Sequence, residues 1–183
     1  MIIQIRGTSG SGKSTVMRAV KDSLGYWNSV HENGRRQPIY YCLNQPKKII
    51  IMGHYETPCG GCDTIGSARQ VYHRVKSLLD VDDNRIILCE GLLLSEDTKW
   101  SSRINNLRVL YLTTSLAKCL FYIKKRRREA GNEKKLNPKN TANRVSVIER
   151  SRIKLIKQGI ICRRGSAKQA PGILLRWIKD AQN

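Results

Sequence analysis

A glycine-rich segment near the start of the chain has residue types and spacing suited to holding phosphate. The pattern G-x-x-x-x-G-K-[ST] is matched without departure by Gly7-Thr8-Ser9-Gly10-Ser11-Gly12-Lys13-Ser14, and Thr15 follows it. Gly7 and Gly12 permit backbone conformations closed to other residues, so successive N–H groups can surround an anion at the start of the next helix. Lys13 is expected to reach the β- and γ-phosphates, in binding and in catalysis, and Ser14 to offer its hydroxyl to Mg²⁺. The segment therefore predicts a site for ATP and Mg²⁺.

A carboxylate follows a second apolar segment of the chain. Glu90 closes the run Ile86-Ile87-Leu88-Cys89, which has the composition of a buried strand. An acidic side chain at the C-terminal end of a parallel strand lies near the ligand crevice of an α/β fold. Glu90 is therefore predicted to help hold Mg²⁺, directly or through water, and an ordinary loop carboxylate is the alternative.

The segment HYETPCGGCDT concentrates reactive groups between a predicted strand and a predicted helix. These groups are His54, Tyr55, Glu56, Cys59, Cys62 and Asp63. Cys59 and Cys62 have C-x-x-C spacing, but no second pair of metal ligands completes a zinc pattern. A redox pair is a second interpretation, although no thioredoxin-like pattern surrounds it.

A third interpretation is a loop that binds the phosphate acceptor. A hydroxyl acceptor needs a general base, whereas a nucleoside monophosphate already presents an anionic nucleophile. Asp63 or Glu56 is a candidate for that base. Asp63 has an alternative structural role as the cap of a helix predicted for residues 66–79.

The charge of the chain is strongly positive and unevenly spread. Thirty-four Lys and Arg against 14 Asp and Glu leave a net charge of +20, and residues 118–164 carry sixteen of the basic residues and three Glu. A nucleotide alone needs only a few cations. The excess therefore favours a polyanionic partner such as DNA or RNA, with a solvated basic face as the alternative.

Part of this basic region is suited to a catalytic lid. Arg126, Arg127 and Arg128 end a predicted helix, and Arg144 and Arg150 lie on the next one. Phosphoryl transfer spreads negative charge over the moving group, so cations aimed at that group lower the barrier. We predict that arginines of this region act as a lid. A solvated charge run, or nucleic-acid contact without catalysis, remains open.

The elements that must position these groups alternate between strands and helices. Strands are expected at residues 1–6, 39–43, 49–52, 85–89 and 107–112, with the second and third forming a hairpin. Helices are expected at residues 14–24, 66–79, 115–129 and 141–157, and a last one from Pro171. This order predicts an α/β fold with a mostly parallel sheet, helices on both faces and a basic helical lid. We expect a single domain over residues 1–183, with the lid and basic region at about 115–160.

No run of about 18 apolar residues occurs, so no membrane span is expected. The N-terminus, MIIQIRG, has no signal-peptide pattern. The six cysteines are therefore expected to be free thiols in a reducing compartment.

Three segments together resemble the phage 5-hydroxymethyluracil DNA kinases, which are P-loop kinases related in fold to the thymidylate kinases. The segments are IIQIRGTSGSGKST, MGHYETPCGGCDTI and RIILCEGLLLS, within roughly the first hundred residues. The resemblance implies ATP-dependent phosphorylation of 5-hydroxymethyl-2′-deoxyuridine within DNA, in the cytoplasm of the host cell. It also implies a step toward hypermodified thymidines that protect phage DNA from host restriction.

The resemblance further implies that the target base leaves the stack, with Tyr55 or Trp100 as candidates to stack on it. Three alternatives remain open at this point. They are a nucleoside monophosphate kinase, a polynucleotide 5′-kinase, and a P-loop DNA-binding ATPase or regulator without an acceptor.

Overall fold

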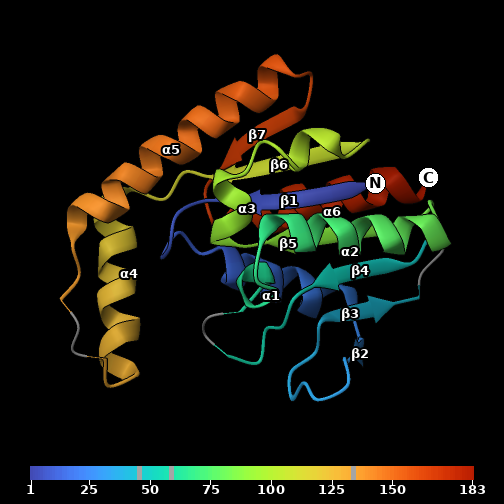
Figure 1. Cartoon of the computed structure of the whole chain (residues 1–183), viewed down its shortest axis with the longest axis horizontal. Coiled ribbons are helices and arrows are strands. Elements are labelled where there is room, and N and C mark those ends of the chain that lie inside the picture. Colours follow the sequence, from blue (N-terminus) through green and yellow to red (C-terminus); the bar gives the residue numbers. More distant parts are fainter. Residues whose placement is uncertain (45–46, 58–59, 133–134) are drawn as a thin grey trace.

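The computed structural model describes residues 1–44, 47–57, 60–132 and 135–183 (Figure 1). The strands of this part form one sheet in the order β2-β3-β4-β5-β1-β6-β7. Their bounds are β1 Ile2–Arg6, β2 Asn28–Val30, β3 Tyr40–Leu43, β4 Ile49–Met52, β5 Ile86–Glu90, β6 Leu107–Leu112 and β7 Ile161–Gly165. β4, β5, β1, β6 and β7 pair in parallel, and β2 and β3 add an antiparallel edge.

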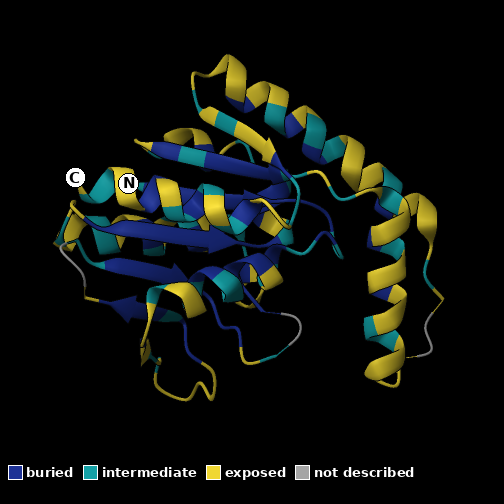
Figure 2. Cartoon of the chain, turned by 180° about the vertical axis from the view of Figure 1, so that it is seen from behind, coloured by how far each residue is buried: buried dark blue, intermediate teal, exposed yellow. Residues whose placement is uncertain are grey.

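Helices cover both faces of the sheet. Their bounds are α1 Lys13–Leu24, α2 Ala68–Val81, α3 Leu92–Glu96, α4 Leu116–Glu129, α5 Pro138–Lys157 and α6 Ala170–Gln182. Successive strand residues point to opposite faces, so Ile3 packs in the core shared with α1 and α6, and Ile2 in the core shared with α2, α3 and α5. Burial on both faces explains the nearly continuous apolar runs of the central strands. Figure 2 shows those strands buried, with α4 and α5 exposed on their outward faces.

The predicted α/β architecture is confirmed. The structure contains the expected first strand and helix, the antiparallel β3–β4 hairpin, and helices at the four later expected places. The helix α5 begins at Pro138, three residues earlier than expected, with Asn137 as its cap. β2 and β7 were not expected, because these short edge strands are largely exposed and lack an apolar run.

The carboxyl ends of the parallel strands meet at one edge of the sheet, beside α4. Figure 1 shows α4 standing next to this edge instead of lying on a face of the sheet. None of the helices in the described ranges is long and apolar enough to cross a membrane.

Candidate active site

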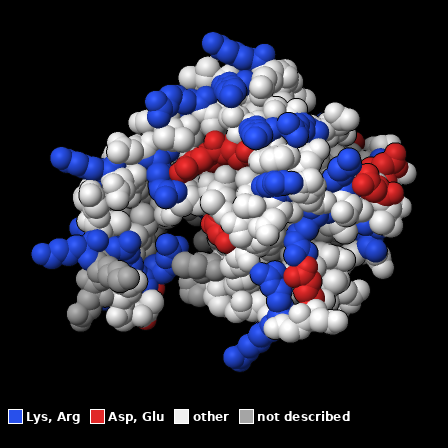
Figure 3. Space-filling view, in the orientation of Figure 1, with Lys and Arg blue, Asp and Glu red and all other residues white. Residues whose placement is uncertain are grey.

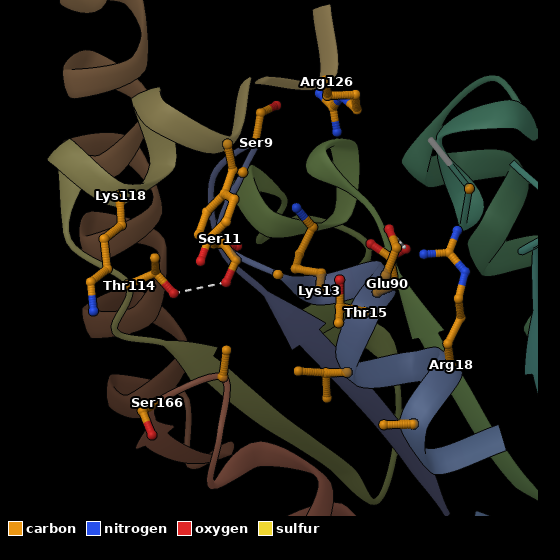
Figure 4. Close-up of a pocket in the computed structure, with 18 of the residues that line it drawn as sticks. Ser9, Ser11, Lys13, Thr15, Arg18, Glu90, Thr114, Lys118, Arg126 and Ser166 are labelled. Carbon is orange, nitrogen blue, oxygen red and sulfur yellow. Dashed lines mark hydrogen bonds between the residues drawn. The ribbon is translucent and has the colours of Figure 1, made fainter. Parts of the chain in front are cut away.

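A cavity of about 930 Å³ opens at the carboxyl edge of the sheet (Figure 4). Its walls come from the segments that follow β1, β6 and β7, the last residue of β5, the helices α1 and α4, and the loop before α2. In open α/β sheets this edge is where ligands bind. The topology therefore brings the phosphate-binding segment and the reactive loop of the sequence to one place.

The glycine-rich segment wraps the base of the cavity. Gly10 and Gly12 have positive φ angles of 76° and 98°, and a Cβ on Gly10 would lie 2.4 Å from the carbonyl oxygen of Cys119 in α4. Lys13 is buried, and its Nζ donates to the carbonyl oxygens of Gly7 at 2.9 Å and Thr8 at 3.2 Å. Burial lowers the pKa of Lys13, against the opposing effect of nearby Glu90.

Two buried hydroxyls of this segment have no hydrogen-bond partner among the described residues, Thr8 Oγ1 and Ser11 Oγ. Buried polar atoms are normally paired, so unpaired donors here indicate a place for ligand oxygens. Thr114, after β6, donates its hydroxyl to the carbonyl oxygen of Ser11 at 2.8 Å and fixes that side of the segment (Figure 4). Ser11, whose hydroxyl is unpaired, lines the cavity, whereas Thr8 is not among the described lining residues.

Glu90 lies at the end of β5, directly beside the first turn of α1. Ser14 Oγ donates to Glu90 Oε1 at 2.8 Å, and Glu90 is 1% exposed. Burial raises the pKa of Glu90, while Lys13 and the Ser14 hydrogen bond oppose that rise. A hydroxyl and a carboxylate at this distance are a donor set that suits Mg²⁺.

Glycines fold the reactive loop back onto Glu90. The Gly61 N–H donates to the His54 carbonyl oxygen at 2.7 Å, and a Cβ on Gly60 would lie 2.1 Å from that same oxygen. Gly61 has a φ of +82°, and a Cβ there would lie 2.3 Å from Glu90 Oε1. The sequence Gly60-Gly61 therefore permits a backbone approach that no larger residue allows.

Asp63 lines the cavity, and its carboxylate caps a helix other than the one expected. Its Oδ2 accepts the Leu92 N–H at 2.9 Å and its Oδ1 accepts the Leu93 N–H at 3.1 Å, at the start of α3. The suggestion that Asp63 caps the helix after the loop is wrong, because Ser67 caps α2 by accepting the Gln70 N–H. The sequence could not reveal this contact, which joins residues 29 positions apart.

The first residues of the loop bond to residues of β3 and β4. Glu56 accepts hydrogen bonds from the Tyr41 hydroxyl and from the Tyr55 N–H at 3.0 Å. Although partial burial opposes ionisation, these bonds hold the pKa of Glu56 below its usual value. Tyr55 is buried and donates its hydroxyl to Met52 O at 3.2 Å, and His54 Nδ1 lies 4.0 Å from Glu56 Oε2. None of these three is among the described residues that line the cavity.

The cysteine pair is only partly described. Cys62 is buried, and burial raises the pKa of its thiol well above the ordinary value. Cys59 lies outside the described residues. Within the described ranges, no group of three or more His, Cys, Asp or Glu side chains is arranged to hold a metal ion.

Of the three arginines predicted to form the lid, one is among the described residues that line the cavity. This residue is Arg126, and Figure 4 shows the Arg126 and Lys13 side chains facing each other across the cavity. Arg127 is half-buried and Arg128 exposed, and neither belongs to that lining. Arg144 pairs with Glu96 at 2.9 Å, and Arg150 is exposed on α5.

Arg18 of α1 is a site residue that the sequence interpretation missed. It lines the cavity, donates from Nε to the Tyr55 carbonyl oxygen at 3.1 Å, and donates from Nη2 to the Thr57 carbonyl oxygen. Arg18 thus ties the reactive loop to the helix that begins with Lys13. The sequence offered one indication of this role, which was the presence of a basic residue on the helix after the phosphate-binding segment.

The segment after β7 was missed as well. Ser166, Ala167 and Lys168 line the cavity, because β7 ends at the same edge as the other parallel strands. Its sequence gave no strand signal, so these residues could not be assigned to the site.

Comparison with known proteins identifies the family. No family model matches the chain. The chain is 39% identical over 147 residues to the 5-hmdU DNA kinase of Pseudomonas phage PaMx11. This alignment covers 76% of this chain and 77% of the relative. The chain is 29% identical over 168 residues to the 5-hmdU DNA kinase of Pseudomonas phage M6, with 86% of each covered.

The fold also has a counterpart among solved structures. The crystal structure of YorR protein from Bacillus subtilis, in complex with phosphorylated GDP, superposes with a TM-score of 0.51 at 16% identity. The match covers 100% of this chain and 99% of that one, so the whole fold is shared. Because of its similarity to the PaMx11 protein, the chain belongs to the 5-hmdU DNA kinase family.

Proposed function

We propose that the protein transfers the γ-phosphoryl group of ATP to the hydroxymethyl group of 5-hydroxymethyl-2′-deoxyuridine within DNA. One observation carries this assignment beyond family membership. A single cavity is lined by the phosphate-binding segment and by Asp63 of the reactive loop, with Glu90 also in its wall. Donor-binding and acceptor-activating groups thus share one space, as a kinase requires.

The phosphate-binding segment holds the triphosphate in this proposal. Its backbone N–H groups and the unpaired hydroxyl of Ser11, which lines the cavity, would face the phosphate oxygens, and Lys13 exchanges its contacts with Gly7 and Thr8 for them. Ser14 and Glu90 would hold Mg²⁺. When bound, this ion neutralises negative charge on the β- and γ-phosphate oxygens.

Asp63 acts as the general base. Each of its oxygens accepts one N–H from α3, which fixes the carboxylate while leaving lone pairs free, because a carboxylate has about four acceptor positions. It takes the proton of the hydroxymethyl group as the new O–P bond forms and ADP leaves. Glu56 is the weaker candidate, since it bonds Tyr41 and Tyr55 and lies outside the described lining.

Arg126 supplies positive charge to the transferred group from the lid. It lies on the face of α4 that also brings Lys118 and Lys125 to the cavity. Residues 1–183 act as a single kinase domain, with the lid and basic region at about 115–160. The net charge of +20 suits an acceptor that is a DNA polymer and not a free nucleotide. Phosphorylation of the base would be one step toward the hypermodified thymidines that shield phage DNA.

One assay separates this function from its rivals. The protein is incubated with γ-labelled ATP and, separately, with duplex DNA containing 5-hydroxymethyluracil, unmodified DNA with free 5′ ends, and dTMP. The products are then digested to nucleosides. We expect label only on the hydroxymethyl group. Label at 5′ ends, label in dTDP, or ATP hydrolysis without transfer would each overturn the proposal in favour of one alternative.

A further inference from the structure

A cluster of cations surrounds Trp100 on the face of the molecule that carries α2 and α3. The Arg103 guanidinium lies 4.8 Å from the centre of the Trp100 ring, the Lys99 ammonium 5.4 Å and the Arg69 guanidinium 5.7 Å. Tyr72 packs against the same ring with 5.4 Å between centroids. Trp100 thus gathers positive charge from α2 and from the segment after α3. We call Arg69, Lys99 and Arg103 the Trp100 cluster.

The three cations of the Trp100 cluster have no carboxylate partner among the described residues. Other arginines on this side of the protein are paired, since Arg74 contacts Glu32 and Arg144 contacts Glu96. The Arg69 guanidinium donates a hydrogen bond to the His73 imidazole at 3.4 Å. Like charges held around one ring repel each other, so this arrangement favours an anion from outside the molecule.

The segment that carries Lys99, Trp100 and Arg103 is held firmly to the sheet. The Asp97 carboxylate accepts the N–H groups of Trp100 at 3.2 Å and Ser101 at 2.8 Å. Arg6 of β1 is fully buried and donates to the Asp97 carbonyl oxygen and the Ser101 hydroxyl, both at 2.5 Å. The backbone that carries Lys99 and Arg103 therefore loses little freedom on binding.

Short stretches of chain connect the Trp100 cluster to Asp63 on the acceptor side of the cavity. Arg69 is in the first turn of α2, which Ser67 caps, and it follows Asp63 by six residues. The segment with Trp100 follows α3, whose first N–H groups bond the Asp63 carboxylate. Figure 3 shows Lys and Arg side chains spread over the face on which α2 and α3 lie in Figure 1.

We propose that Arg69, Lys99 and Arg103, gathered around Trp100, bind the phosphate backbone of the DNA that flanks the target nucleotide. The proposal rests on the proposed function, because that function makes DNA the acceptor. Trp100 does not belong to the described lining of the cavity and is half-buried beneath its cations, so it supports backbone contacts and does not stack on the flipped base. These contacts position DNA in a way that is independent of its sequence.

The test compares two double variants that remove the same charges from opposite faces of the sheet. Lys99→Gln with Arg103→Gln alters the Trp100 cluster. Arg176→Gln with Lys179→Gln is the matched control, since both residues are exposed on α6, which packs in the other core. Binding to a thymidine-containing duplex without hydroxymethyl groups is measured by fluorescence anisotropy over a range of salt concentrations. Melting temperature and ATP affinity report on the fold and the P-loop.

We expect the Trp100-cluster variant to bind DNA on the order of 10- to 100-fold more weakly than the wild type near 0.1 M salt. The slope of log K against log salt concentration should fall in magnitude by up to about two. The control variant keeps the wild-type affinity and slope. The inference would be overturned if the cluster variant bound DNA with the affinity and salt slope of the wild type. It would also be overturned if the control variant lost as much DNA affinity as the cluster variant.

The duplex in this test carries no hydroxymethyl group and binding is measured without ATP, so the result does not depend on phosphoryl transfer. Cluster-dependent DNA binding without labelled hydroxymethyluracil would refute the proposed function alone. Transfer to hydroxymethyluracil with unchanged binding by the cluster variant would refute this inference alone.

Discussion

The hydroxyl of Ser14 donates a hydrogen bond to the carboxylate of Glu90 at 2.8 Å, which joins the first turn of α1 to the last residue of β5. The same carboxylate oxygen, Oε1, lies where a side chain on Gly61 would have to stand. Glu90 is therefore touched from one side by the phosphate-binding segment and from the other by the reactive loop. This junction links the proposed donor and acceptor halves of the site.

Glu90→Gln should remove most turnover while leaving the fold intact. The amide keeps the size of the carboxylate but not its charge, so it binds Mg²⁺ poorly. We expect kcat to fall by on the order of 10²-fold or more. Circular dichroism checks the fold and steady-state kinetics at several Mg²⁺ concentrations check the loss. Near-normal turnover would rule out a metal-binding role for Glu90.

The same substitution has a consequence for stability without Mg²⁺. Burial raises the pKa of Glu90 in the folded protein, so its stabilising contribution is complete at low pH and is lost as pH rises through that raised pKa. Glu90→Gln should therefore unfold in urea at an equal or higher concentration than the wild type at pH 7, and with a weaker fall in stability between acidic and neutral pH. A large destabilisation at pH 7 would contradict this expectation.

Gly61→Ala tests the close approach of the loop to Glu90. Gly61 has a φ of +82°, and a Cβ there meets Glu90 Oε1 at 2.3 Å. Gly159→Ala is the matched control, because Gly159 has a φ of +80° but no atom of the described residues lies within 4 Å of a Cβ there. Both variants bear backbone strain of about 1–2 kcal/mol. We expect only Gly61→Ala to lose activity as well, by at least tenfold. Equal activity in the two variants would refute the role of this approach.

Asp63→Asn separates a catalytic role from a capping role. An asparagine still accepts a hydrogen bond at the start of α3 but takes up no proton, so kcat should fall by on the order of 10² to 10⁴. Ser67→Ala is the comparison, since it removes the cap of α2 and should cost about 1 kcal/mol of stability with activity retained. Unfolding curves and kcat are measured for both. An active Asp63→Asn enzyme would leave Asp63 with a structural role only.

Arg126→Ala and Arg128→Ala test which lid arginine serves the reaction. Arg126 lines the cavity, whereas Arg128 is exposed and lies outside the described lining. We expect Arg126→Ala to lower kcat by on the order of 10²-fold with little change in ATP affinity, and Arg128→Ala to keep a kcat near that of the wild type. Equal losses at both positions would indicate a general contribution of basic charge.

The parts of the site that follow from local sequence were predictable. The phosphate-binding segment needs only its own glycines, Lys13 and a strand before it, and Glu90 could be placed because it ends an apolar run. Mostly parallel packing followed from the alternation of elements.

The remaining parts depend on contacts between distant segments. The Asp63 cap on α3, the approach of Gly61 to Glu90, and the bonds of Arg18 to the loop join segments separated by 29 or more residues. No local pattern encodes them. His54 and Glu56 were grouped with Asp63 because they are neighbours in sequence, yet the fold directs Glu56 toward Tyr41. The edge strand β7 has exposed arginines where a strand pattern needs apolar residues.

The most direct test of the central claim uses an oligonucleotide duplex with one internal 5-hydroxymethyluracil and chemically blocked 5′ ends. After incubation with ATP and Mg²⁺, the intact mass of the modified strand is measured, and its nucleosides are identified after digestion. We predict a strand that gains phosphate on the hydroxymethyl group with the wild type, and none when thymine replaces the modified base. No mass gain with the modified base, or an equal gain with thymine, would contradict the account.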